Sequence, residues 1–329
     1  MIISQTPLRI SLSGGGTDLS NYYLPYEGFV VSTAIDKYIY VIVKERFDNL
    51  IYVDYSSKEI IESINEIKHD LVREAALLTG MTKGFEVMMF ADIPSEGSGL
   101  GSSSSLTVGL LHAFYQYLGK LVTAEQLAVE ACKIEIDILK RPIGKQDQYI
   151  AAYGGLKSFR FCKDETVEVT PIEIVSEAKR KLGSNLLLFF TDTTRKAASI
   201  LEEQSKNVLS KIEFHHKIKE LAFDTLDGLN SLDINRVGEN LKINWEMKKQ
   251  LASNVSNSEI DKMHQLAMDG GALGAKISGA GGGGFLLVYC ERDKQDTLRR
   301  SMRMYRELPF FLEKYGSKII FDQTRYDIK

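Results

Sequence analysis

Residues 94–105 read Pro94-Ser-Glu-Gly-Ser-Gly-Leu-Gly-Ser-Ser-Ser-Ser105. A predicted apolar strand over 85–93 precedes this run, and a predicted helix over 102–118 follows it. A strand, a glycine loop and a helix start can bind an anion, because the first turn of a helix presents unpaired N–H groups and about half a positive charge. The loop lacks the lysine of G-x-x-x-x-G-K-[ST] and does not match G-x-G-x-x-G. The alternative is that the serines only cap a core helix.

Glycines gather in three places along the chain. We call residues 14–16 the first glycine segment, 97–101 the second and 274–284 the third; the third contains Gly274, Gly279 and Gly281 to Gly284. Glycine tolerates positive φ and lets a ligand or another backbone approach closely. Three such clusters, far apart in sequence, predict one site assembled from distant segments rather than three isolated tight turns.

The composition limits the class of protein. The chain has 329 residues, 44% of them hydrophobic, which is typical of a globular protein of about two domains. Its net charge of −3 disfavours a nucleic-acid or membrane-surface binder. Three cysteines are too few for a disulfide framework, and no apolar run is long enough for a membrane helix or a secretion signal. We therefore expect a cytoplasmic protein.

Periodicity predicts the remaining elements, working outward from the second glycine segment. Strands are expected over 1–12, 30–43, 50–54, 185–191 and 318–321, with two more around the glycine turn of 276–290. Helices are expected over 58–79, from Thr123 to the break at Pro142, and over 195–230, 233–250, 258–269 and 294–306. The polar segment 173–184 suggests a division into an N-terminal domain, 1–175, and a C-terminal domain, 176–329.

Glu135 lies on the apolar stripe of the helix that Thr123 begins. Its neighbours one turn away are Ala131, Cys132, Ile138 and Leu139. A buried carboxylate needs a cation partner, either a metal ion such as Mg²⁺ or the side chain of an arginine or lysine. Downstream, Asp147 lies in the polar run 144–149, which we expect to be a loop, and it could be a base or a turn residue.

The three glycine segments resemble, in order and spacing, the three motifs of the GHMP kinase superfamily. The first motif is matched by Pro7-Leu-Arg-Ile-Ser-Leu-Ser-Gly-Gly-Gly-Thr-Asp18, the phosphate loop by residues 94–105, and the third motif by Lys276-Ile-Ser-Gly-Ala-Gly-Gly-Gly-Gly-Phe285. The resemblance implies an α+β fold, the GHMP kinase fold. Its N-terminal half would be like ribosomal protein S5 domain 2, with a left-handed β-α-β crossover, and its C-terminal half would be ferredoxin-like.

The same resemblance implies an ATP-dependent sugar kinase with ATP and Mg²⁺ as cofactors. The first-motif wording, the loop 144–149 and Thr191-Asp-Thr-Thr-Arg195 are most similar to kinases that phosphorylate the anomeric oxygen of D-glycero-D-manno-heptose 7-phosphate. The implied partners are small molecules, ATP and a sugar phosphate, and a homodimer is left open. Alternatives are a kinase for fucose, galactose, mannose, mevalonate or homoserine, a decarboxylase of the same fold, and a non-catalytic galactokinase-like sensor.

The resemblance also implies roles for individual residues. Asp147 corresponds to the catalytic Asp and Arg9 to the basic residue paired with it, while Ser103 and Glu135 correspond to the Mg²⁺ ligands. The phosphate loop would bind ATP through Gly97, Gly99, Leu100, Gly101, Ser102, Ser103 and Ser104. The acceptor would contact Asp18, Gly16, Thr17, Gly281 and Gly282.

An acceptor that already carries a phosphate needs further cations. Arg195 and Lys196 follow the predicted strand 185–191 and are our candidates, with Arg141 and Lys145 as alternatives. Cations are unfavourable at a helix start unless an anion binds there, so the opposing interpretation is a solvated helix start.

Overall fold

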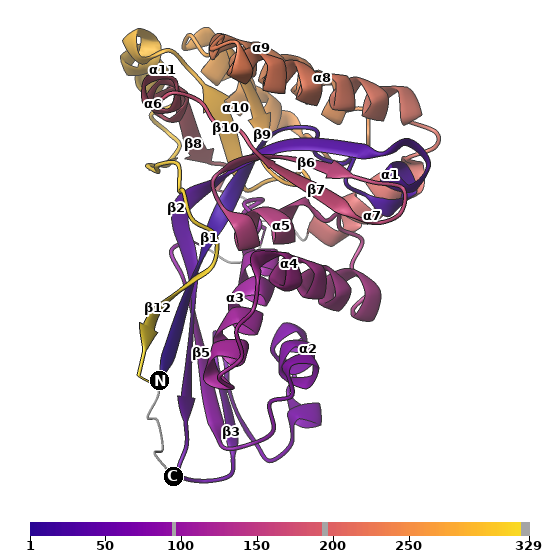
Figure 1. Cartoon of the computed structure of the whole chain (residues 1–329). Helices are drawn as coiled ribbons and strands as arrows, with labels where there is room; N and C mark the ends of the chain where they lie inside the picture. Colours follow the sequence, from indigo (N-terminus) through magenta and orange to yellow (C-terminus); the bar gives the residue numbers. More distant parts are fainter. Residues whose placement is uncertain (94–96, 193–196, 324–329) are drawn as a thin grey trace.

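The computed structural model describes residues 1–93, 97–192 and 197–323. Among these residues the larger sheet has eight strands in the order β12-β1-β2-β5-β3-β4, with β6 also paired to β2 and β7 to β6. In Figure 1, β5, β3 and β12 of this sheet lie in the lower part of the molecule and β6 and β7 lie higher up, with α2, α3 and α4 on one side of the lower strands. Its strands are β1 (Ile2–Ser13), β2 (Gly28–Glu45), β3 (Ile51–Asp54), β4 (Lys58–Ile61), β5 (Phe85–Ala91), β6 (Leu156–Phe161), β7 (Val167–Pro171) and β12 (Lys318–Asp322).

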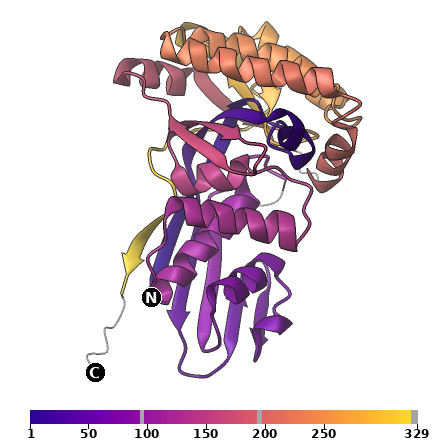
Figure 2. The same cartoon turned by 45° about the vertical axis from the view of Figure 1, so that its right-hand side comes forward.

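The second sheet is antiparallel and follows the order β11-β8-β10-β9. Its strands are β8 (Leu186–Phe190), β9 (Gly274–Ile277), β10 (Phe285–Tyr289) and β11 (Glu307–Leu308). Six of the described α-helices belong to this half: α6 (Ser176–Asn185), α7 (Ala197–Asn207), α8 (Ile212–Asn230), α9 (Asn235–Lys248), α10 (Ser258–Asp269) and α11 (Gln295–Ser301). Figure 2 shows the long ones above the sheet. The mixture of sheets and helices confirms the α+β fold.

The other described α-helices lie around the larger sheet. They are α1 (Ser20–Tyr26), α2 (Asp70–Thr79), α3 (Ser102–Tyr117), α4 (Ala124–Cys132) and α5 (Gln146–Tyr153). The short helical turns are η1 (Ile64–Glu66), η2 (Lys133–Ile138) and η3 (Arg292–Lys294), and η3 packs against α11. None of the described helices is long and apolar enough to cross a membrane.

Helix α3 packs against β1 and β2 at the centre of the larger core. Leu110, Leu111 and Phe114 of α3 are fully buried, as are Leu8 of β1 and Val41 of β2. The spacing of the three α3 residues matches the apolar stripe read from the sequence. Because this helix is held by its apolar face, its N-terminus and the second glycine segment have a fixed position at the end of the sheet.

Three predicted elements differ from the structure. Residues 58–61 form β4 rather than the start of a helix, because they pair with β3 in a hairpin and the carboxylate of Glu59 is buried, where it accepts hydrogen bonds from the backbone of Lys68 and His69. The expected loop 144–149 begins helix α5, with Asp147 in its first turn. The expected helix 294–306 ends at Ser301, and the following residues reach β11.

The end of the chain returns to the larger sheet. Strand β12 pairs antiparallel with β1, so that Ile2 faces Asp322. The larger hydrophobic core also continues into the second half through Leu182, Leu188 and Leu229. The division into 1–175 and 176–329 stays a prediction, and β12 shows that chain order and sheet membership differ at the C-terminal end.

Candidate active site

A cavity of about 800 Å³ joins segments that are far apart in the sequence. Its wall includes Gly15 and Gly16 of the first glycine segment and Asp18, which lies two residues after that segment. The second segment contributes residues 97–99 and 101, and the third contributes Gly279 and Ala280. The second and third segments touch through their backbones, since a Cβ on Gly279 would stand 2.6 Å from the Gly99 Cα atom. The glycine segments therefore meet at one site, as the sequence predicts.

The second glycine segment turns the chain into α3. Gly97, Gly99 and Gly101 have φ values of 69°, 72° and 80°, in the left-handed region that favours glycine, and Gly101 caps the helix. The Leu100 carbonyl accepts a hydrogen bond from the backbone N–H of Arg9. Ser102 and Ser104 are buried, whereas Ser103 is exposed, and all three line the cavity. The first turn of α3 thus presents N–H groups and one exposed hydroxyl to the cavity, which suits a phosphate.

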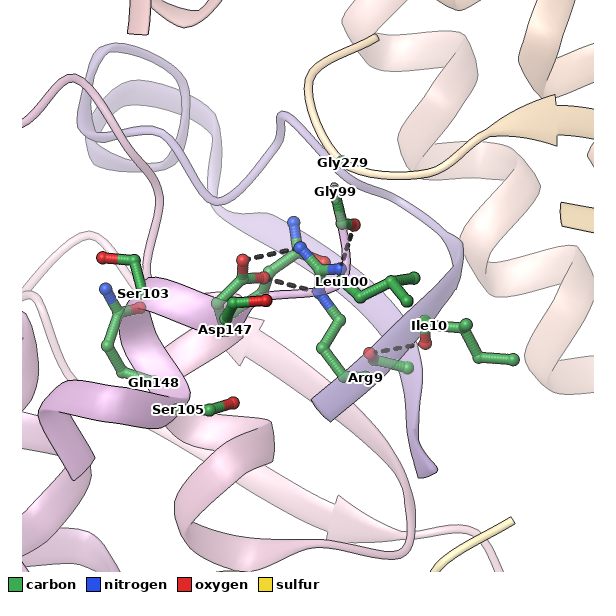
Figure 3. Close-up of polar contacts among 12 residues, drawn as sticks. Arg9, Ile10, Gly99, Leu100, Ser103, Ser105, Asp147, Gln148 and Gly279 are labelled. Carbon is green, nitrogen blue, oxygen red and sulfur yellow. Dashed lines mark hydrogen bonds and ion pairs between the residues drawn. The ribbon is translucent and has the colours of Figure 1, made fainter. Parts of the chain in front are cut away.

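Arg9 and Asp147 form a bidentate ion pair in the cavity wall (Figure 3). The Arg9 Nε atom donates to Oδ1 at 2.7 Å, and Nη2 donates to Oδ2 at 2.6 Å. The third nitrogen, Nη1, donates to the Gly99 carbonyl at 2.6 Å. Arg9 is 4% exposed, so the pair is strongly held. One side chain therefore fixes β1, the phosphate loop and the start of α5 relative to one another.

Glu135 is fully buried at the turn where α4 continues into the π-helical turn η2. Ser103 Oγ donates to its Oε1 atom at 2.6 Å, and Gln148 Nε2 donates to Oε2 at 2.7 Å. Arg141 Nη1 donates to the same Oε1 at 3.2 Å, while Nη2 lies 2.9 Å from Asp70 Oδ2. Burial raises the pKa of Glu135, and these hydrogen bonds and the Arg141 charge oppose that rise. In this structure the cation partner of Glu135 is Arg141.

The same oxygen atoms fit a divalent cation that shares its ligands with a bound phosphate. The described residues contain no group of three His, Cys, Asp or Glu side chains that could hold a metal alone. Glu135 and the Ser103 hydroxyl offer the carboxylate and hydroxyl oxygens that Mg²⁺ takes, and phosphate oxygens would complete its shell. Gln148 donates a hydrogen bond to Glu135 through Nε2, and its Oε1 atom is buried with no hydrogen-bond partner. This Oε1 atom is one more oxygen acceptor beside Glu135.

The first glycine segment holds Asp18 next to Asp147. Asp18 Oδ1 accepts from the Gly16 N–H at 2.9 Å, and Oδ2 accepts from the Gln146 N–H at 3.1 Å. Burial, followed by the charge of Asp147, raises the pKa of Asp18. Thr17 is buried, and its hydroxyl donates to the Gly14 and Phe29 carbonyls, so it shapes the turn from inside. Asp18 and Gly16 line the cavity beside the reactive pair.

Two of the predicted acceptor contacts, Gly281 and Gly282, lie beside the cavity lining and not in it. Gly281 and Gly282 pack against Val255 and Ile200, while their neighbours Gly279 and Ala280 line the cavity. Arg195 and Lys196 lie outside the described residues.

Lys248 is a cavity residue that the sequence did not single out. It ends helix α9, lines the cavity and donates to the Ile277 carbonyl at 2.9 Å and to the Gly279 carbonyl. A lysine near the end of a polar helix is typical of a solvated surface, so local sequence carries no signal for this placement. Lys276, which the third motif contains, is 4% exposed and also lines the cavity.

Comparisons with known proteins agree with this geometry. The family model described as "GHMP kinases N terminal domain" matches residues 60–155, and that described as "GHMP kinases C terminal" matches residues 225–306. The chain is 34% identical over 319 residues to the D-glycero-alpha-D-manno-heptose 7-phosphate kinase of Campylobacter jejuni, covering 92% of this chain and 93% of that protein. It is 25% identical to the galactokinase of Pyrococcus furiosus, covering 90% and 91%.

Solved structures give the same result. A D-glycero-D-manno-heptose 1-phosphate kinase from Bacteroides thetaiotaomicron superposes with a TM-score of 0.83 at 26% identity, over 98% of this chain and all of that one. The structure of a putative sugar kinase from Campylobacter jejuni superposes with a TM-score of 0.79 at 32% identity, over 97% of both chains.

Proposed function

This chain belongs to the GHMP kinase family and is an ATP-dependent sugar kinase, and we propose that its acceptor is D-glycero-D-manno-heptose 7-phosphate, which it converts to the 1,7-bisphosphate. The product would serve the synthesis of nucleotide-activated heptose. Use of ATP fits a cytoplasmic enzyme, and a homodimer stays an open part of the proposal.

The observation that carries the proposal is the Arg9–Asp147 pair. On one side of the pair, Arg9 donates a hydrogen bond to the Gly99 carbonyl of the phosphate loop. On the other side lies Asp18, which we assign to the acceptor and whose charge interacts with that of Asp147. Phosphoryl transfer depends mainly on positioning and on stabilising charge, so a carboxylate fixed between the two substrates is the feature the reaction needs.

In the proposed reaction, the anomeric oxygen of the acceptor bonds to the γ-phosphorus of ATP. The bond from that phosphorus to the β,γ-bridging oxygen breaks, and ADP leaves. Asp147 accepts the hydrogen bond of the anomeric hydroxyl and receives its proton, which passes to water afterwards. Arg9 holds Asp147 in place through two hydrogen bonds. Asp18 would orient the sugar by accepting hydrogen bonds from neighbouring hydroxyls.

The phosphate loop would bind the nucleotide through Gly97, Gly99, Leu100, Gly101 and Ser102 to Ser104. Ser103 and Glu135 would hold Mg²⁺, which when bound neutralises charge on the β- and γ-phosphates. Arg141 contacts both of these side chains and would have to release them. The loop donors and Arg9 face the same cavity, so the chain's own residues also stabilise the transferring group.

Two relatives support a heptose that already carries a phosphate, one named for the 7-phosphate and one for the 1-phosphate. The 7-phosphate is favoured because it leaves the anomeric oxygen free. Gly16, Thr17, Gly281 and Gly282 remain proposed acceptor-side residues, and Arg195 and Lys196 remain proposed partners of the acceptor phosphate. A kinase for fucose, galactose or mannose is the alternative, favoured by the similarity to a galactokinase.

An acceptor panel tests the proposal. Purified enzyme with Mg-ATP would be assayed for ADP release with heptose 7-phosphate, heptose 1-phosphate, mannose, fucose, galactose, mevalonate and homoserine. We expect kcat/KM for heptose 7-phosphate to exceed every other value by at least about tenfold. A higher value for an unphosphorylated sugar would refute the proposed acceptor while leaving the kinase assignment intact.

A further inference from the structure

Two lysines that line the cavity, the partly buried Lys248 and the buried Lys276, have hydrogen-bond partners but no carboxylate partner among the described residues. Lys248 Nζ donates to the carbonyls of Ile277 and Gly279, and Lys276 Nζ donates to the Leu12 carbonyl at 3.0 Å. Within residues 1–93, 97–192 and 197–323, no carboxylate lies within ion-pair distance of either ammonium group. Carbonyl oxygens satisfy the N–H donors, but they do not neutralise the charge.

These lysines and Arg9 lie close enough together for their charges to interact. Burial, followed by the charge of Arg9, lowers the pKa of Lys248 to about 7. Burial, Lys248 and Arg9 together lower the pKa of Lys276. Asp147 already pairs with Arg9, so it offers no free charge to the lysines. A bound anion would favour the charged form of both ammonium groups, and it would therefore complete this region.

Contacts of the helix end place Lys248 on the acceptor side. One turn earlier, Asn244 Nδ2 lies 3.4 Å from Ser13 Oγ, directly before the first glycine segment. One turn later, Leu251 lies 4.0 Å from where a Cβ on Gly16 would stand. Lys248 therefore lies between two residues that contact the segment we assign to the acceptor.

The anion could come from either substrate. The phosphates of ATP would be held by the N–H groups of α3, and Ser103 and Glu135 would hold the metal ion that neutralises them. Lys248 also contacts Gly279, which packs on Gly99 of the phosphate loop, so the γ-phosphate is the competing source. The contacts that Asn244 and Leu251, on either side of Lys248, make with Ser13 and Gly16 favour the acceptor.

We propose that Lys248 binds the phosphate group that the acceptor already carries and thereby selects a phosphorylated sugar over the parent sugar. The inference rests on the proposed function, and it names Lys248 as a residue that contacts the phosphate group of the acceptor. An ammonium group has three N–H donors, and two contact carbonyls, so one remains for a phosphate oxygen. The phosphate would also supply the missing negative charge.

The test compares Lys248→Met with Lys249→Met. Lys249 is the adjacent residue, pairs with Glu246 at 2.9 Å and does not line the cavity, so it is a matched control. We expect Lys248→Met to lower the ratio of kcat/KM for heptose 7-phosphate over heptose at least about tenfold, with less than about a threefold change in the KM for ATP. The Lys249→Met enzyme should keep the wild-type ratio.

Two kinetic results would overturn the inference. A rise in the KM for ATP without a change in the acceptor ratio would assign Lys248 to the γ-phosphate. An equal loss of kcat/KM on both acceptors would assign it a structural role in holding the third glycine segment.

Calorimetry without nucleotide separates this inference from the proposed function. Failure of the wild-type enzyme to turn over heptose 7-phosphate would remove the proposed acceptor. The binding of mannose 6-phosphate and of mannose would then decide the role of Lys248. Tighter binding of the phosphorylated sugar by wild type, lost in Lys248→Met, supports the inference; equal binding of both sugars by wild type contradicts it.

Discussion

At the scale of single residues, the charge state of Lys248 predicts a pH dependence. Its pKa of about 7 means that the free enzyme loses this charge as the pH rises through 7. A neutral amine binds phosphate weakly, so the KM for a phosphorylated acceptor should rise above pH 7, approaching about tenfold per pH unit. An unphosphorylated acceptor should not follow this trend. The measurement is acceptor KM from pH 6.5 to 8.5.

The other charged groups around Lys248 do not oppose this trend. Arg9 on β1 and Asp147 on α5 form an ion pair with each other. Burial, followed by the charge of Asp147, raises the pKa of Asp18, and the negative charge that Asp18 gains as the pH rises would also weaken the binding of a phosphate. Lys276 on β9 has a lowered pKa and would add to the effect, and burial lowers the pKa of His215 on α8 to about 4, so it stays neutral. Lys248→Arg keeps the charge at this position and should give a profile less steep than that of the wild type. A flat profile in the wild type would contradict the charge role.

Predictions for single residues were confirmed where the spacing of apolar residues along a helix determines which side chains are buried. The apolar stripe around Glu135 predicted a buried carboxylate with a cation partner, and the structure has both. The partner itself, Arg141, follows from a chain reversal after η2 that no local pattern encodes. Lys248 was missed for the same reason, because its burial depends on the third glycine segment folding over the end of α9.

At the scale of elements, the contact between the second and third glycine segments predicts a position-specific effect of alanine. Gly99 and Gly119 both have positive φ, but a Cβ on Gly99 would stand 2.4 Å from the Ser278 carbonyl oxygen, whereas nothing lies within 4 Å of one on Gly119. Gly119→Ala should lose only the backbone cost, about 1 kcal/mol of unfolding free energy. Gly99→Ala should lose more and should also bind Mg-ATP at least about tenfold more weakly.

Urea unfolding and nucleotide calorimetry on both variants check this prediction. Equal losses of stability, together with wild-type nucleotide affinity in Gly99→Ala, would show that the two segments need not touch for ATP to bind. The control matters because it separates the strain of a left-handed residue from the loss of the contact between segments.

Most elements were predictable because hydrophobic periodicity determines them. Helix α3 and strand β5 match their predicted ranges closely. The run 144–149 was expected to be a loop because its polar residues lack an apolar stripe, yet its continuation, Tyr149 to Ala152, is buried and makes it the first turn of α5. The helix then favours Asp147 near its positive end, a feature that only the folded chain provides.

At the scale of the whole molecule, the cavity lies where both sheets contribute loops. Arg9 belongs to the larger sheet and Lys276 to the smaller one, and both line the cavity. The sequence predicted this meeting of distant segments from its glycines. It could not predict that β12 would pair with β1 at the edge of the sheet, because the residue pattern of a short strand does not indicate which strand it pairs with.

The central claim is that this assembled site transfers the γ-phosphate to the anomeric oxygen of a sugar phosphate. Phosphorus NMR of a reaction with Mg-ATP and heptose 7-phosphate tests it most directly. The account predicts ADP and one new phosphorus signal coupled to the anomeric proton, formed at least about 100-fold more slowly by Asp147→Asn, with exposed Asp137→Asn as the control. Free phosphate in place of that signal, or a phosphate coupled to any other sugar position, would contradict the account.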